Sequence, residues 1–255
     1  KQNYKVESIV KTQNGANAYL KKSDEIQKRT IPIVKTLLTQ ISEKKSIKKE
    51  INSATTKITL RYGLIDMNRT ITGYLKGNYN DSADKFETIN GDSISTWNNF
   101  NWNSKHYCTS IFIPSEFGTK IKSDVKNSIV TDSKIHTITH VLVNASKILT
   151  KSESNDIDAY YEDGVIHLFD NTSDGYNGCS KMIYENFEKI MDTCFDLVNE
   201  CDCPVDPKQK KAVSEGEEWG GCPKCTFTTN YCQTKNKKLS KNEALEFFSI
   251  FKREI

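Results

Sequence analysis

The stretch 220-GGCPKCTFTTNYC-232 lies near the end of a chain of 255 residues, a little way after 201-CDC-203. The chain has 8 cysteines, and five of them fall in these two stretches: Cys201, Cys203, Cys222, Cys225 and Cys232. A Cys-x-x-Cys turn lets two sulfur atoms reach one ion at about 2.3 Å, and a second pair from elsewhere completes a tetrahedron. The spacing therefore predicts a metal centre.

Zinc is the expected occupant, although an iron–sulfur cluster takes the same ligands and unliganded, reduced thiols are a further alternative. Five thiols compete for four positions, so one is spare. We expect the spare to be Cys201, because it is the last residue of the helix predicted for residues 179–201. Four thiolates leave no coordination position for water, so we expect one structural zinc ion rather than a catalytic one.

Composition excludes some classes of protein. The chain has 36 Lys and Arg against 33 Asp and Glu, so its charge of +3 gives no argument for nucleic acid or membrane binding, and any basic surface must be local. No run approaches the roughly 18 apolar residues of a membrane span, and the first residues lack the apolar core of a signal peptide. Clustered thiols then favour a reducing, cytoplasmic compartment. Because the chain opens with Lys1, we expect a fragment of a longer protein.

Strands are predicted in three parts of the chain. Residues 54–77 are dense in Thr, Ile, Tyr and Leu and break at Gly63, which predicts two strands in a hairpin. Residues 107–113 predict a buried strand that is stopped by the following proline. Residues 157–171 predict two short strands joined by an Asp-Gly turn. We expect these segments to form one sheet.

Apolar residues at helical spacing predict the helices. One begins near Pro32 within an N-terminal helical segment or linker, residues 1–53. A last helix begins with Ser240 and Glu243 at capping-box spacing. The other predicted helices lie within residues 118–150 and 179–201. The expected fold class is α+β: a β-sheet flanked by helices, with a C-terminal four-cysteine zinc knuckle and the terminal helix packed on one edge.

The same cysteines carry a family resemblance. The end of the chain resembles the C-terminal zinc-binding signature of superfamily 2 DNA helicases of the mitomycin repair factor A type, through 199-NECDC-203, 221-GCPKC-225, Cys232 and 235-KNKKLSKNEALEFF-248. Weaker matches occur upstream in the family's order, at residues 70–77, 136–145 and 166–178. Two departures are a long polar insertion, residues 204–221, and a turn at residues 173–178 that is poorer in glycine.

The resemblance implies that residues 54–255 form a helicase-associated zinc-binding domain. Such a domain supports the binding of single-stranded or duplex DNA, in DNA repair, and the assembly of the helicase motor. The sequence holds no Gly-x-x-x-x-Gly-Lys-Ser/Thr phosphate loop, so we expect no activity from this chain alone and motor domains supplied in cis or in trans. The alternative function is a stand-alone protein-interaction subunit of a multi-protein defence or repair system.

Four other residues are candidates for nucleic-acid contact. His136 and His140 have the spacing of a metalloprotease zinc pair, but Thr137 stands where such enzymes need a glutamate; packing within the helix is the alternative. Asp170 ends a predicted strand, where it presents a functional carboxylate or only fixes the next turn. Lys181 opens the next helix and can help to hold a phosphate. A hydrolase using His136, His140 and Asp170 requires a second, non-thiolate metal.

Overall fold

The computed structural model describes twelve stretches of the chain: residues 4–12, 15–22, 28–39, 47–53, 56–78, 87–90, 101–114, 133–162, 164–203, 222, 224–228 and 239–252. The chain divides into two compact units, and each is considered by itself. The first unit combines Lys1–Leu38 with Met67–Asn103, and the second combines Thr39–Asp66 with Ser104–Ile255.

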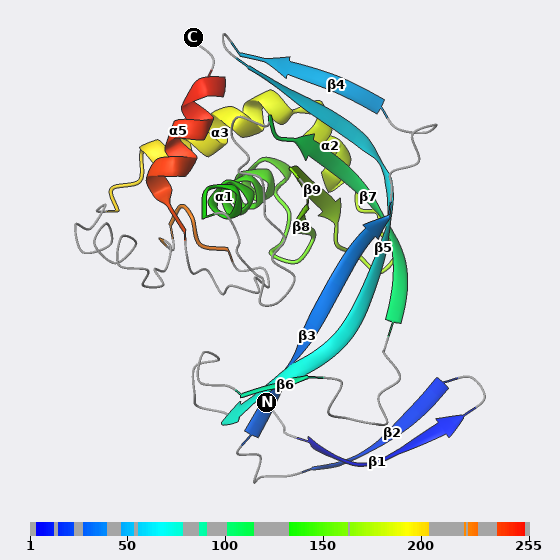
Figure 1. The fold of residues 1–255 in the computed structure, drawn as a ribbon. Coiled ribbons are helices and arrows are strands. Elements are labelled where there is room, and N and C mark those ends of the chain that lie inside the picture. Colours follow the sequence, from blue (N-terminus) through cyan, green and yellow to red (C-terminus); the bar gives the residue numbers. More distant parts are fainter. Residues whose placement is uncertain are drawn as a thin grey trace. The chain divides into compact units, whose positions relative to one another are not determined.

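The first unit is built of strands. An antiparallel hairpin pairs β1 (Tyr4–Thr12) with β2 (Gly15–Lys22). Strands β3 (Lys28–Thr39) and β6 (Glu87–Asn90) both pair with the long strand β5 (Lys57–Asn78) (Figure 1). The helix predicted near Pro32 is therefore wrong. The segment is rich in β-branched residues, which lose side-chain freedom in a helix and suit a strand.

The hairpin predicted within residues 54–77 is also wrong, because β5 is one strand of 22 residues that runs through Gly63. Strand β4 (Ile47–Asn52) pairs antiparallel with its first part, and β6 pairs with a later part that begins at Gly73. Both glycines are buried inside the strand. A glycine in a strand marks a close approach as readily as a turn, and here it does not end the strand.

The second unit contains a sheet and the helices. Hydrogen bonding joins its strands in the order β5-β7-β9-β8, with β7 at Asn101–Phe112, β8 at Ile157–Glu162 and β9 at Val165–Asp170. The pairs β7–β9 and β8–β9 are antiparallel. The hairpin predicted for residues 157–171 is confirmed, and its turn includes Gly164 at a φ of +82°. The predicted sheet thus exists, with β7 longer than expected.

Four helices are described in the second unit: α1 (Ser133–Thr150), α2 (Cys179–Glu185), α3 (Phe187–Asn199) and α5 (Lys241–Phe251). The helix predicted for residues 179–201 is divided at Asn186. The cap predicted for α5 is confirmed, since the Ser240 side chain accepts the N–H of Glu243 at 3.4 Å. Residues 118–130, where the α1 segment was expected to begin, lie outside the described residues.

Helix α1 is the centre of the core. All of its side chains from Ile135 to Val143 are buried, and it packs against β8, α2, α3 and α5 (Figure 1). A helix that is buried on nearly every side must satisfy its polar side chains within the protein. The fold class is α+β, as predicted. In the part of the chain that is described, no helix combines the length and apolar character needed to cross a membrane.

The turn after β9 is fixed closely on β7. The N–H of Tyr107 donates to the carbonyl of Gly175 at 2.9 Å. Gly175 has a φ of +71°, and a Cβ atom there would lie 1.8 Å from the carbonyl oxygen of Lys105. Only glycine fits, both for its backbone conformation and for the lack of space.

We predict that Gly175→Ala lowers the free energy of unfolding by about 3 kcal/mol or more, because the backbone of β7 or of the turn must move. Gly164→Ala is the matched control: its φ is +82° but no atom lies within 4 Å of an added Cβ. The control should lose only about 1 kcal/mol. Urea unfolding measures both, and equal losses would contradict the account.

Candidate metal centre

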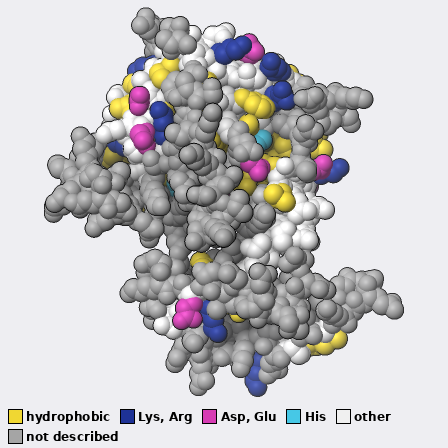
Figure 2. Space-filling model, in the orientation of Figure 1, with side chains coloured by type: hydrophobic (Ala, Val, Ile, Leu, Met, Phe, Trp, Pro, Cys, Tyr) yellow, Lys and Arg dark blue, Asp and Glu magenta, His cyan; other side chains and the backbone are white. Residues whose placement is uncertain are grey.

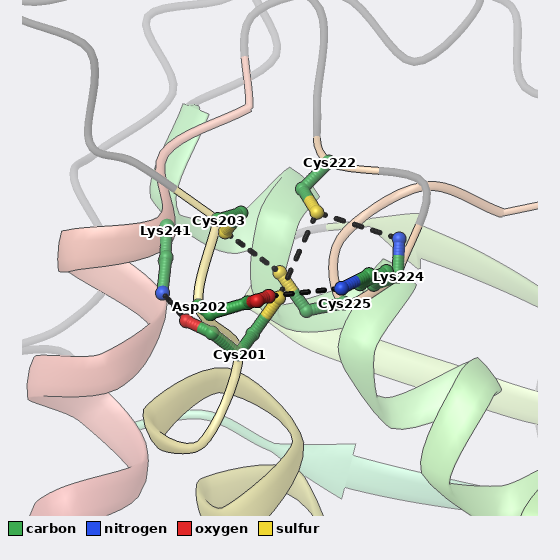
Figure 3. Close-up of polar contacts among 7 residues, drawn as sticks. All are labelled: Cys201, Asp202, Cys203, Cys222, Lys224, Cys225 and Lys241. Atoms are coloured by element: carbon green, nitrogen blue, oxygen red, sulfur yellow. Dashed lines mark hydrogen bonds and ion pairs between the residues drawn. The ribbon is translucent and has the colours of Figure 1, made fainter.

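Four thiols gather in the second unit, and their sulfur atoms all lie within 4.8 Å of one another: Cys201, Cys203, Cys222 and Cys225 (Figure 3). Two Sγ–Sγ distances, Cys201 to Cys222 and Cys203 to Cys225, are both 3.8 Å. Sulfur atoms about 2.3 Å from a central zinc ion stand about 3.8 Å apart in a tetrahedron. A disulfide needs about 2.05 Å, and these cysteines are free. The spacing therefore suits one metal ion.

The four clustered thiols include one cysteine that we did not expect to bind the metal. Cys201, which we expected to be the spare thiol, lies in the cluster. Helix α3 ends at Asn199, so Cys201 stands beyond the helix, and its side chain turns toward the other sulfurs (Figure 3). Cys232 lies outside the described residues. The four described thiols are enough for one zinc ion.

The second pair of cysteines lies in a tight turn from Cys222 to Thr228, called the knuckle below. The carbonyl of Cys222 accepts the N–H groups of Cys225, Thr226 and Phe227 at 3.3, 3.0 and 2.8 Å. The N–H of Lys224 points at the Cys222 sulfur at 3.4 Å. The Thr226 hydroxyl accepts the N–H of Cys222 at 2.8 Å. These bonds fold the backbone around the first sulfur, as a chelating turn requires.

The environment favours a thiolate at one position and opposes it at two others. Burial raises the pKa of Cys222, but hydrogen bonds from the N–H groups of Lys224 and Cys225 and from the thiols of Cys203 and Cys201 together outweigh it, and the pKa falls to about 7. Burial raises the pKa of Cys203 and of Cys225. A bound cation reverses this opposition, because coordination deprotonates a thiol outright. The donor set thus fits a metal ion.

Two lysines lie beside the thiols (Figure 3). The ammonium of Lys224 lies 2.9 Å from Asp202 Oδ1, and its hydrogen bond holds the pKa of that carboxyl below its usual range. The ammonium of Lys241, in the first turn of α5, donates to the carbonyl of Cys201 at 2.6 Å. Positive charge here offsets part of the negative charge of a four-thiolate centre.

The predicted histidine pair, His136 and His140, lies in α1, and His140 contacts the knuckle. His136 and His140 are 7% and 5% exposed, and their rings stack edge to face with centroids 4.3 Å apart. His140 Nδ1 donates to the carbonyl of Thr226 at 3.1 Å. Burial favours the packing alternative over contact with nucleic acid. Among the described residues, the four thiols are the only metal-binding group, so the second metal of a hydrolase has no described site.

Asp170 is wholly buried and organises a turn. Its carboxylate accepts the N–H groups of Asn177 and Gly178 at 3.1 Å and of Ser180 at 2.6 Å. Its backbone carbonyl accepts a hydrogen bond from His106 Nδ1 at 2.8 Å. The carboxylate therefore caps the start of α2 and fixes the turn before it, which is the alternative role considered for this residue.

Lys181 lies on the surface of α2. Its ammonium stands 3.9 Å from Glu185 Oε1, one helical turn away, and both side chains are more than half exposed. Such an ion pair adds little stability and leaves the ammonium accessible. Contact between Lys181 and a phosphate stays a prediction.

The sequence interpretation missed three residues that hold the centre. Asn144 donates to two knuckle carbonyls, Lys241 binds the Cys201 carbonyl, and the Thr226 hydroxyl binds the Cys222 N–H. One signal was available. Asn144 follows His140 by four positions, so both lie on the same face of a helix that is otherwise apolar there.

We predict that Asp170→Asn lowers the free energy of unfolding by about 2 kcal/mol or more, because an amide offers one acceptor oxygen and turns an NH2 group toward backbone donors. Asp174→Asn removes the same charge from an exposed side chain of the same turn, where water screens the hydrogen bonds that lower the pKa of Asp174, so it should lower the thermal midpoint much less. Thermal unfolding measures both variants. A midpoint for Asp170→Asn equal to that of the control would contradict the capping role.

Comparison with known proteins supports the zinc assignment. Residues 138–226 match the family described as the MrfA Zn-binding domain. An uncharacterized protein of Methanocaldococcus jannaschii is 27% identical over an alignment 121 residues long, which covers 44% of this chain and 93% of the relative.

Two crystal structures of the DUF1998 helicase MrfA are also similar. The one bound to DNA has a TM-score of 0.53 at 16% identity and covers 98% of this chain; the one bound to DNA and AMPPNP has a TM-score of 0.49 at 14% identity and covers 96%. This chain spans only 28% and 25% of their lengths. At 16% sequence identity, the likeness to the DNA-bound structure shows a similar fold and nothing more. The family match covers less than half of the chain, but residues 138–226 include all four clustered thiols, so this part of the chain is similar to the MrfA Zn-binding domain at the metal centre itself.

Proposed function

We propose that this chain is the non-motor, zinc-binding part of an ATP-dependent superfamily 2 DNA helicase, where it supports DNA binding and motor assembly. The observation that carries the proposal is the fold likeness to a DNA-bound helicase, which extends over 98% of this chain and 28% of that one. On this proposal the remaining length of the helicase corresponds to the motor. The free thiols support a reducing, cytoplasmic compartment for the protein.

The proposed ligands are Cys201, Cys203, Cys222 and Cys225. The family match ends at residue 226, before Cys232, which supports this set. Zinc, when bound, supplies a tetrahedral joint with no open position for water, so its role is structural. The first two thiols follow α3 and the other two lie in the knuckle, and the joint therefore ties the end of α3 to a turn held by α1.

Local groups rather than bulk charge support the proposed contact with DNA. Acidic and basic side chains are interspersed among the described residues on the face shown in Figure 2. Tyr107 and Tyr176 are 38% and 50% exposed and pack edge to face, with ring centroids 5.1 Å apart. Exposed aromatic rings stack on unpaired bases without regard to sequence. We propose this tyrosine pair, with Lys105 and Lys181 as exposed ammonium groups, for single-strand contact.

A second candidate function is a stand-alone subunit that works with a separately encoded motor. The Methanocaldococcus jannaschii relative favours it, because the match covers 93% of that protein and leaves no room for a motor. Purification of the natural protein separates the two candidates. A single long polypeptide with helicase motor domains supports the first, and a short chain that copurifies with a motor supports the second.

We predict about one zinc ion per purified chain, lost in each of the variants Cys201→Ser, Cys203→Ser, Cys222→Ser and Cys225→Ser. Elemental analysis by mass spectrometry measures the metal. Cys232→Ser is the control and should keep its zinc. The reverse pattern, with zinc kept by Cys201→Ser and lost by Cys232→Ser, would contradict the proposed ligand set and restore Cys201 as the spare.

We predict that the zinc-loaded chain binds a fluorescent single strand of DNA, and that binding weakens between about 50 and about 200 mM salt as phosphate contacts are screened. Tyr107→Ala and Tyr176→Ala should each weaken binding about fivefold or more, since stacking on one base contributes about 1–3 kcal/mol. Fluorescence anisotropy measures the affinity.

Tyr19→Ala removes a comparably exposed tyrosine from β2 and is the matched control. It should leave the affinity unchanged. Absence of binding at the lower salt concentration, or equal losses in all three variants, would overturn the proposed single-strand contact.

A further inference from the structure

Two side chains on one face of α1 form hydrogen bonds with the knuckle. His140 and Asn144 stand one helical turn apart. Asn144 Nδ2 lies 3.3 Å from the carbonyl oxygen of Cys225 and 2.8 Å from that of Phe227. His140 Nδ1 lies 3.1 Å from the carbonyl oxygen of Thr226. Three successive carbonyls of the knuckle are therefore bound by one helix.

These carbonyls need partners because of how the knuckle is folded. The N–H groups of Cys225, Thr226 and Phe227 all turn toward the carbonyl of Cys222, inside the turn. Cys225 and Thr226 are 0% and 1% exposed. Buried carbonyls without partners are costly, and α1 supplies the partners. The hydrogen bonds thus fix the backbone that carries the Cys225 sulfur.

We propose that His140 and Asn144 are positioning residues of the zinc centre. They hold the backbone on which the Cys225 thiolate stands, and so set the zinc affinity without touching the ion. The inference rests on the proposed ligand set. His140 performs this role as a ring protonated on Nδ1, since a carbonyl only accepts a hydrogen bond and that nitrogen must donate it.

Thr137 lies three residues before His140, on the same face of α1. Its hydroxyl accepts the N–H of Ser240, the cap of α5. Of the two residues that bind knuckle carbonyls, Asn144 gives the cleaner test because it is only half buried. His140 is almost fully buried, so its replacement also disturbs packing.

The test measures the zinc affinity of the whole chain by competition with a chromophoric chelator. Asn144→Ala should lower the affinity about tenfold or more, the size of effect seen when partners behind metal ligands are removed. Asn171→Ala is the matched control, since Asn171 Nδ2 donates to the carbonyl of Asn155 at 3.1 Å, outside the knuckle. The control should bind zinc as the unaltered chain does.

A second readout separates positioning from general stability. Cobalt(II) in place of zinc gives visible absorption bands that depend on the angles between the thiolates, so Asn144→Ala should shift these bands and Asn171→Ala should not. Asn144→Asp should behave like Asn144→Ala, because a carboxylate cannot donate to carbonyls. It also serves as the test variant if the alanine variant does not fold.

Two results would overturn the inference: unchanged zinc affinity in the Asn144 variants, or an equal loss in Asn171→Ala. Cys225→Ser distinguishes this failure from failure of the ligand set. If Cys225→Ser loses zinc while the Asn144 variants keep full affinity, the ligand set stands and the positioning role falls. If Cys225→Ser keeps its zinc, the ligand set itself is wrong.

Discussion

The second unit depends on one constraint: four sulfur atoms from two separate stretches must meet at a distance set by a tetrahedral ion. The residues that follow α3 supply Cys201 and Cys203, and the knuckle supplies Cys222 and Cys225. Hydrogen bonds hold the knuckle to α1 and the Cys201 carbonyl to α5, but no described hydrogen bond of the backbone joins the two stretches to each other. A shared cation joins them, and the polar insertion between them is tolerated because the entropy cost of closing a loop grows slowly with its length.

Hydrogen bonds connect the two thiol-bearing stretches to helices α1 and α5. Helix α1 binds the knuckle carbonyls through His140 and Asn144, and α5 binds the Cys201 carbonyl through Lys241. The cap residue Ser240 donates its N–H to the Thr137 hydroxyl of α1. Polar side chains on the face of a buried helix therefore connect the metal centre to the helix that ends the described chain.

The features that were predicted correctly from the sequence are those that a local pattern of residues determines. Thiol spacing predicted the metal centre, alternation and turn residues predicted β8 and β9, and Ser240 with Glu243 predicted the start of α5. Prediction from the sequence failed where long-range pairing decides: the segment around Pro32 is a strand because β5 lies beside it, and Gly63 lies within a strand. The place of Cys201 in the cluster was missed because one-dimensional spacing does not show where α3 ends.

Hydrogen exchange of the zinc-loaded and the chelator-treated chain tests the central claim most directly. The account predicts that removal of zinc speeds exchange in the knuckle, at the end of α3 and in α5, while β8 and β9 keep their protection because their ladder contains no thiol ligand. Exchange that stays the same in α5 and the knuckle, or that rises equally in β8 and β9, would contradict it.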